Sequence, residues 1–238
     1  MPTSTVMIMA TDRIMPTDPA ALPRLFQLIS PSLPIGAYSY SQGIEWAAEA
    51  GWIRCAQDLE CWLQGLLESG QKYLELPLLL RLMAAWRGRD LAAVHRWNAF
   101  LLASRETREL RLEEGRRARA LARILTSLDD GLVPADTGLL ATQHAAYALA
   151  CVGWGIDENS ACHGLAWSWL ENLVLAAVKI LPLGQTEGQQ VLMRLADRLP
   201  VVIEQARSVA DDELGASSQA LALASSAHEA QYTRLFRS

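Results

Sequence analysis

The stretch SPSLPIGAYSYSQGIEW, residues 30–46, holds serines, glycines and tyrosines at the close spacing that nucleophilic and phosphate-binding sites use. A serine hydrolase elbow requires G-x-S-x-G between a strand and a helix. Around Ser41 the first glycine of that motif is replaced by Ser39, and no strand pattern precedes it. A P-loop requires Gly-Lys followed by Ser or Thr, but Gly43 is followed by Ile44. The stretch therefore favours neither a serine nucleophile nor nucleotide binding.

The same stretch carries signals of a turn followed by a helix. Its prolines and first glycine favour a turn, and Ser39 with Gln42 has the spacing of a capping box. We therefore expect a helix from Ser39 to Ala50. Tyr38 and Tyr40 flank this cap, and tyrosines of this kind either pack inside or contribute to protein interfaces.

The cysteines and histidines show no compact metal-binding spacing. The chain has four of each, and no two cysteines form a C-x-x-C pair. We therefore expect no metal site and a reduced, cytoplasmic setting. The residues are Cys55, Cys61, Cys151, Cys162, His95, His144, His163 and His228.

Two further segments have polar groups at helical spacing. In the arginine-rich segment 105–123, the pairs Arg105 with Glu109 and Glu113 with Arg117 are four residues apart. This pattern predicts either a solvated, self-paired helix face or a docking surface for a partner.

The second segment, residues 164–185, is a mostly apolar helix with a narrow polar stripe. At about 100° per residue, Ser168, Asn172 and Lys179 fall within about 40° of one another. Lys179 either snorkels or pairs with a core carboxylate, or it points into an interface or a polar channel.

The composition indicates a folded, all-helical protein. Hydrophobic residues make up 51% of the 238 residues and charged residues 20%, which is enough apolar material for a core. Apolar spacing of three and four recurs along the chain, whereas alternating runs are nearly absent. We expect one all-α domain, an irregular bundle of about eight to ten helices at 23–210. A flexible leader (1–22) precedes it, and a linker with a partner-binding tail (211–238) follows.

Local signals place the individual helices. We expect helices over 22–29, 39–50, 58–69 and 72–86, the last with a kink at Pro77, and a helix from Asp90 that continues or breaks near Gly115 on its way to residue 128. After a loop at 129–134 we expect helices over 136–151, over 157–181, and from a capping box at Thr186 and Gln189 to about residue 198.

Charge and hydropathy exclude two classes of partner. The net charge of −5 and the lack of a clear helix-turn-helix argue against nucleic acid. The longest strongly apolar stretch, 173–181, is too short to span a membrane. One enzymatic reading stays open: an all-α enzyme that binds a small apolar substrate near Trp154, Trp167 and Trp169.

From Pro23 onward the chain resembles the urease accessory protein F family. The resemblance rests on these segments, in the family's order: LISPSLPIGAYSYSQGIEWAAEAGWI, LELPLL, RETRELRLEE, AVKILPLGQ and HEAQYTRLFRS. The leader lies outside it. In the last segment Ala227 and Ala230 depart from the family pattern, which affects the tail contacts that the family implies.

The resemblance implies an all-α, non-enzymatic maturation factor that forms a homodimer. It implies three partners: urease accessory protein D (also called H), the urease accessory GTPase and apo-urease. It also implies that the chain modulates the GTPase and that nickel is handled by the complex, with no cofactor bound stably by this chain.

The resemblance also assigns roles to residues. It implies that Tyr38, Glu45, Glu75 and Lys179 communicate with the GTPase. It implies that the tail binds protein D through His228, Glu229, Tyr232, Arg234, Leu235 and Phe236.

Overall fold

The computed structural model describes residues 18–238, and within this range the chain is helical and contains no strand. The all-α prediction is therefore confirmed; of the leader, residues 1–17 lie outside the described residues. The α-helices are α1 (Leu22–Ile29), α2 (Ile44–Glu49), α3 (Ala56–Leu66), α4 (Leu76–Gly88), α5 (Leu91–Ser104), α6 (Arg108–Leu128), α7 (Gln143–Gly153), α8 (Glu158–Ile180), α9 (Gln185–Ala196), α10 (Leu199–Arg207) and α11 (Gln219–Glu229).

Helices α3 and α4 form one continuous helix, because a π-helical segment, η2 (Leu67–Glu75), joins them. The predicted break between 69 and 72 is therefore wrong. Pro77 lies in the first turn of α4, where a residue without a backbone N–H is tolerated. The π-helical segment ends two residues before Pro77, and π turns are frequent at functional sites.

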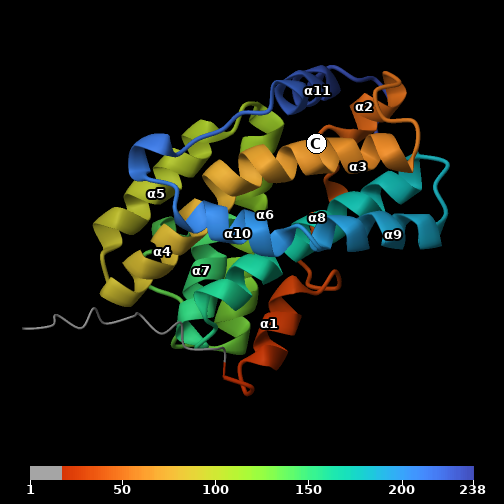
Figure 1. The fold of residues 1–238 in the computed structure, drawn as a ribbon. Helices are drawn as coiled ribbons and strands as arrows, with labels where there is room; N and C mark the ends of the chain where they lie inside the picture. Colours follow the sequence, from red (N-terminus) through yellow and green to blue (C-terminus); the bar gives the residue numbers. More distant parts are fainter. Residues whose placement is uncertain (1–17) are drawn as a thin grey trace, which may run out of the picture.

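Helix α8 forms the centre of the bundle and packs against α1, α2, α4, α9 and α10 (Figure 1). Asp157 caps it as predicted, accepting hydrogen bonds from the backbone N–H groups of Asn159 and Ser160. Gly164 allows a close approach to α8, since a Cβ there would lie 2.7 Å from Leu25 and from the Tyr147 hydroxyl. Helix α7 fills the remaining side of the core against α4 and α6.

The start of α2 differs from the prediction. A 3-10 turn, η1 (Ala37–Ser39), comes first, and the helix begins only at Ile44 with no side-chain cap. Gln42 and Gly43 have φ values of 49° and 81°, and this left-handed backbone delays the helix. The Ser39–Gln42 capping box is therefore wrong.

Of the next predicted helix boundaries, some are confirmed and one is displaced. Asp90 caps α5, and residues 129–134 form the expected loop. The helix that we expected to continue or to break near Gly115 runs unbroken through Gly115, and the break lies earlier, between α5 and α6, where Thr107 caps α6.

The starts of helices α7 and α9 also differ from the predicted ones. The single helix expected over 136–151 is divided into η3 (Thr137–Leu140) and α7, which Thr142 caps. Helix α9 begins one residue before Thr186, with Gly184 at the cap position, so the second capping box is wrong as well.

The C-terminal region lies on the core. The sequence predicts a flexible segment from 211, but residues 219–229 form α11, which packs against α2 and α6. The chain then returns toward α2 and ends with Phe236 and Ser238 buried; Figure 1 shows the C-terminus between α2, α3 and α11.

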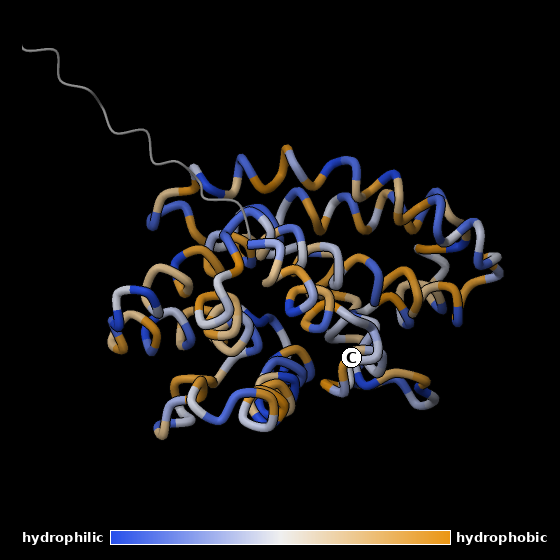
Figure 2. Tube along the Cα trace, turned by 90° about the horizontal axis from the view of Figure 1, so that it is seen from below, coloured by the Kyte–Doolittle hydropathy of each residue, from blue (hydrophilic) through white to orange (hydrophobic). Residues whose placement is uncertain are grey.

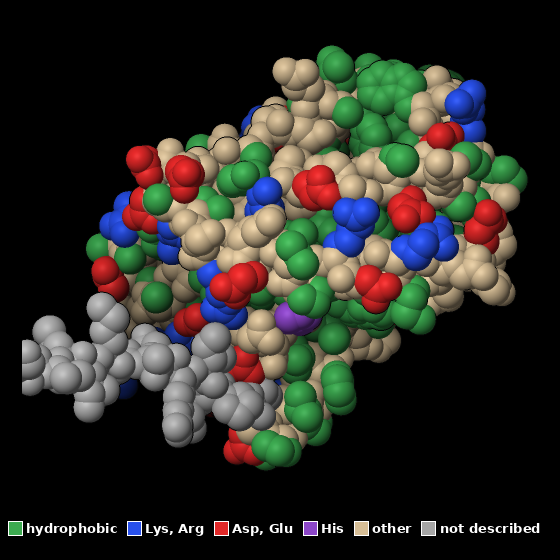
Figure 3. All heavy atoms as spheres, viewed as in Figure 1, with side chains coloured by type: hydrophobic (Ala, Val, Ile, Leu, Met, Phe, Trp, Pro, Cys, Tyr) green, Lys and Arg blue, Asp and Glu red, His purple; other side chains and the backbone are tan. Residues whose placement is uncertain are grey.

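The surface mixes charged and apolar side chains. Hydrophobic and hydrophilic residues alternate along most helices (Figure 2), as expected for amphipathic helices around one core. On the face in Figure 3 acidic and basic side chains intersperse, while hydrophobic ones gather over α1. Over residues 18–238 no helix has the length and apolarity that a membrane crossing requires.

Candidate functional site

Glu45, in the first turn of α2, anchors the end of the chain. Its carboxylate accepts hydrogen bonds from the backbone N–H of Leu235 at 2.6 Å and of Phe236 at 2.8 Å. The Glu45 side chain is buried. Because a carboxylate strengthens the hydrogen bonds that it accepts, this residue fixes the tail backbone at a defined place on α2.

His228 of α11 lies between two carboxylates. Its Nε2 is 3.2 Å from Glu45 and its Nδ1 is 2.7 Å from Glu109 of α6, and the ring is fully buried. Glu109 also pairs with Arg234 at 2.5 Å. Glu109, which the sequence favoured as a partner of Arg105, therefore joins α6 to the tail instead.

The serine-rich stretch around η1 holds the last residues. The carbonyl oxygen of Ser238 accepts hydrogen bonds from the backbone N–H groups of Ser41 and Gln42 at 2.7 and 3.0 Å and from the Ser41 hydroxyl at 2.7 Å. The backbone N–H of Arg237 donates to the Ser39 carbonyl at 2.8 Å. These serines therefore bind the chain's own backbone. We call residues 228–238 in this position the docked tail.

We predict that Gly43→Ala detaches α11. A Cβ at Gly43 would lie 3.0 Å from the Ala224 Cβ and 3.4 Å from the Ser225 backbone nitrogen, and overpacking of this kind costs about 1–3 kcal/mol. Amide hydrogen exchange in 219–238 should accelerate about tenfold or more.

The matched control for this prediction is Gly36→Ala. Gly36 has φ 78°, close to the 81° of Gly43, but a Cβ there meets nothing within 4 Å. Both variants carry the same backbone strain, so equal exchange in the two would contradict the predicted contact.

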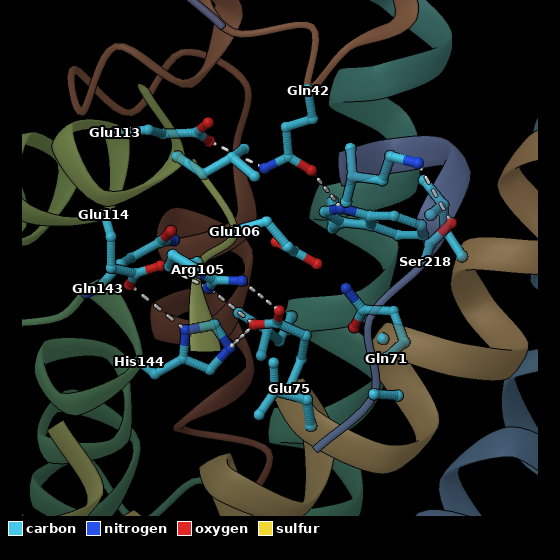
Figure 4. A pocket seen from close by; sticks show the side chains of 18 of the residues that line it. Gln42, Gln71, Glu75, Arg105, Glu106, Glu113, Glu114, Gln143, His144 and Ser218 are labelled. Carbon is cyan, nitrogen blue, oxygen red and sulfur yellow. Dashed lines mark hydrogen bonds and ion pairs between the residues drawn. The ribbon is translucent and has the colours of Figure 1, made fainter. Parts of the chain in front are cut away.

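A second group of charged side chains lies where η2, α6 and α7 meet; Figure 4 shows it. Glu75, Glu114 and His144 are buried and Arg105 is half-buried. Arg105 bridges two carboxylates, with Nη2 3.0 Å from Glu75 and 2.6 Å from Glu114. His144 lies opposite, with Nε2 3.0 Å from Glu75 and Nδ1 3.6 Å from Glu114. We call these four residues the buried charge cluster.

Mutual pairing keeps the buried charge cluster ionised. Burial opposes charge on Glu75, but Arg105 and His144 outweigh it and lower the Glu75 pKa to about 2. Burial also opposes charge on His144, but Glu114 and Glu75 raise the His144 pKa to about 9. Two negative and two positive groups therefore balance, an arrangement that joins helices and does not supply a free acid or base.

The cluster predicts a pH dependence of stability. A raised pKa means that the contribution of His144 is complete below about pH 6.5 and is lost as the pH rises through about 9. The free energy of unfolding should fall over that range by about 3 kcal/mol, measured by denaturant titration.

The control for this pH dependence is a pair of histidine variants. His144→Gln should flatten the slope between pH 6.5 and 9, whereas His163→Gln, on the more exposed side of α8, should leave it unchanged. An unchanged slope in His144→Gln would contradict the assignment.

A pocket of about 70 Å³ separates the buried charge cluster from the linker before α11. Glu75 lies on its wall, and Ser218 and Trp169 line the other side. Gln42 lies beside it, donating to Glu113 at 2.9 Å and accepting from Trp169 at 2.9 Å. Gln42 therefore joins the turn before α2 to α6 and α8.

A second pocket, of about 110 Å³, brings Tyr38 and Lys179 together. Ser168 and Asn172 also line it, so the polar stripe predicted on α8 does face one cavity. Lys179 is exposed, and the described residues offer it no ion pair; its ammonium lies 6.0 Å from the centre of the Phe236 ring. The option of a buried lysine–carboxylate pair is therefore wrong.

The residues predicted for the tail divide into two sets. His228 and Phe236 are buried anchors, whereas Tyr232 is fully exposed and the Leu235 side chain is 67% exposed. Glu229 accepts a hydrogen bond from the backbone N–H of Glu109 at 2.9 Å. The tail thus presents an aromatic and an aliphatic side chain outward from a fixed backbone.

Sequence reasoning missed Arg105, Glu109, Glu114 and His144. The sequence places the first three in a segment that is either a solvated, self-paired helix face or a docking surface. The predicted Glu113–Arg117 pair forms at 2.9 Å, but its side chains are largely buried. Whether these side chains are solvated or paired inside the protein depends on their burial, and residue spacing alone does not predict burial. Acidic residues that fall on the apolar side of α6 were the one available signal.

The features that suggested an enzyme do not meet in one place. Trp169 and Trp167 line different hollows, and Trp154 donates to Asp129 at 3.2 Å elsewhere. Cys162 and Cys151 are buried, and burial raises the pKa of the Cys162 thiol to about 12. Within residues 18–238, no group of three or more Asp, Glu, His or Cys side chains is arranged to hold a metal ion.

Comparison with known proteins agrees with the resemblance. The family model described as UreF matches residues 53–196. The chain is 51% identical over 222 residues to a urease accessory protein UreF of Alcanivorax borkumensis, covering 90% of this chain and 97% of the relative. It is 45% identical over 232 residues to the protein of the same description in Chromohalobacter salexigens, covering 97% and 100%. This chain belongs to the UreF family of urease accessory proteins.

Proposed function

We propose that this chain is a non-catalytic scaffold for urease maturation. It binds urease accessory protein D (H) and the urease accessory GTPase, modulates the GTPase, and supports delivery of nickel to apo-urease. The docked tail is the observation that carries the proposal: a fixed backbone presents Tyr232 and Leu235 to solvent. Family membership supports the same role.

The tail is the proposed contact with protein D. Exposed aromatic and aliphatic side chains on an anchored backbone lose little conformational entropy on binding, which favours interface hot spots. In this proposal His228 and Phe236 hold the tail, Tyr232 and Leu235 contact protein D, and Arg234 and Glu229 fix the tail to Glu109 and α6.

The residues proposed for GTPase communication act in two ways. Tyr38 and Lys179 are exposed and line one pocket, which suits direct contact with the GTPase. Glu45 and Glu75 are buried and paired within the chain, so we propose that they act through the docked tail and through the buried charge cluster.

The remaining parts of the proposal concern assembly. We propose that two copies form a homodimer through the open hollow between α1 and α8, where Leu25, Ile29 and Trp167 lie beside the exposed Phe26. Sedimentation of the full chain with Trp167→Asp tests this part. We also propose that the chain divides into a leader (1–22), a core (23–210) and a tail (211–238), and that it is cytoplasmic. Nickel is the cargo that the complex carries.

We predict that Lys179→Ala weakens binding of the GTPase about tenfold, because truncating a charged interface anchor typically costs more than about 1 kcal/mol. Pull-down of the purified GTPase by the full chain measures this. The matched control is Lys72→Ala, since Lys72 is the only other lysine and lies over Tyr73 on η2. Equal binding by wild type and Lys179→Ala would refute the direct contact.

A second arm of the experiment distinguishes the role of the docked tail from that of the pocket lined by Tyr38 and Lys179. Deletion of residues 215–238 should abolish capture of protein D, whereas Lys179→Ala should retain it. In cells that lack only this gene, the deleted chain should then fail to restore nickel-loaded urease. Capture of protein D by the truncated chain would contradict the tail role.

A further inference from the structure

Helix α6 carries a stripe of arginines on its outer face. At about 100° per residue, Arg108, Arg116, Arg119 and Arg123 fall within about 80° of one another. All four are exposed. They extend over 16 residues of helix, a length of about 22 Å. Leu112, 36% exposed, lies within the same arc. We call these four arginines the α6 arginine stripe.

The arginines of the stripe differ from the others of the same segment. Arg105 and Arg117 pair with Glu75, Glu114 and Glu113 on the inner side of the helix. The described residues offer the stripe no carboxylate within ion-pair distance and no hydrogen-bond acceptor. Four positive charges thus stand together, uncompensated, on a chain whose net charge is −5.

Placing these arginines next to one another lowers the stability of the helix slightly. Like charges at positions four apart on a helix destabilise it by a few tenths of a kcal/mol, and Arg119 has like-charged neighbours on both sides along the stripe. The carboxylates of α6 that could relieve this, Glu109, Glu113 and Glu114, are committed to the tail and to the core. The stripe is therefore available to an external anion.

We infer that the α6 arginine stripe docks an acidic protein surface, one that presents carboxylates along about 22 Å. Guanidinium groups pair with carboxylates in a bidentate geometry, and Leu112 adds an apolar contact at the centre of the stripe. A narrow line of charge suits one helix or strand of a partner. Asp129 and Asp130 at its end, with the net negative charge, oppose a polyanion that continues past α6.

This surface goes beyond the proposed function, because it includes neither the docked tail nor the pocket of Tyr38 and Lys179. The partner is defined by its chemistry alone: Asp and Glu side chains spaced three or four residues apart. Electrostatic complementarity of this kind sets association rate and partner choice more than affinity.

The test uses the full chain and a synthetic helical peptide of about twenty residues with glutamates along one face. Binding is followed by fluorescence anisotropy at roughly 0.05 M and 0.3 M salt, where screening differs strongly. The triple variant Arg116→Gln, Arg119→Gln, Arg123→Gln should weaken binding about tenfold at low salt, from three exposed ion pairs.

The matched control removes three other exposed arginines, Arg24, Arg89 and Arg96, also as glutamine. It should change the affinity less than about twofold. Equal losses in the two triple variants, or no loss in either, would overturn the inference. Tighter binding of a 20-nucleotide DNA or of phosphatidylserine vesicles at the same salt would assign the stripe to another class of partner and overturn it too.

A second measurement keeps the inference testable in the assembled complex. A photo-reactive side chain at Arg119, in a mixture of purified urease and its accessory proteins, should cross-link to a segment of net negative charge. A cross-link only to neutral or basic segments would contradict the inference. The proposed scaffold function is tested independently of the stripe, by the pull-down experiments with Lys179→Ala and with the tail deletion.

Discussion

Arg105→Ala is expected to lower the free energy of unfolding by about 3–5 kcal/mol, because it leaves Glu75 and Glu114 buried without their shared guanidinium. His144 alone cannot neutralise both carboxylates. One of them must then take up a proton or draw in water, and the packing of η2 against α6 loosens. Chemical denaturation at pH 7 measures the change.

Two further variants separate a buried charge effect from a simple loss of contacts. Arg198→Ala breaks an exposed pair with Glu68 and should cost less than about 1 kcal/mol. Adding Glu114→Gln to Arg105→Ala removes one uncompensated charge, so it should restore part of the stability. A double variant that is less stable than Arg105→Ala would contradict the electrostatic explanation.

Glu45→Gln is expected to release the docked tail. The amide is the same shape, but its nitrogen cannot accept a hydrogen bond, and the charge opposite His228 is lost. Hydrogen bonds to a charged group are worth about 1.5–3 kcal/mol each. Docking should therefore weaken by about 3 kcal/mol, and exchange of the Leu235 and Phe236 amides should accelerate about 100-fold.

The control for this prediction lies one turn further along α2. Glu49→Gln removes an exposed carboxylate that, within residues 18–238, bonds only to the Gln231 side chain, so the tail amides should keep their protection. If Glu45→Gln loses GTPase modulation while its tail stays protected, then Glu45 acts on the GTPase directly and the indirect route through the tail is wrong.

Local signals predicted most of the elements and few of the contacts. Asp90 and Asp157 cap their helices because a cap needs only neighbouring residues. The prediction failed where distant groups compete for a side chain: Gln42 bonds to α6 and α8 and does not close a capping box.

The sequence by itself determined the all-α class, a mostly apolar helix (α8) with a polar stripe, and the motifs that indicate the family. Only the tertiary structure decided which charges are buried. Arg105 pairs with carboxylates 30 residues before it and nine after it, and Glu45 with a tail about 190 residues away. Helical period and capping act over four residues, whereas the strength of an ion pair depends on burial, which packing of the whole chain sets.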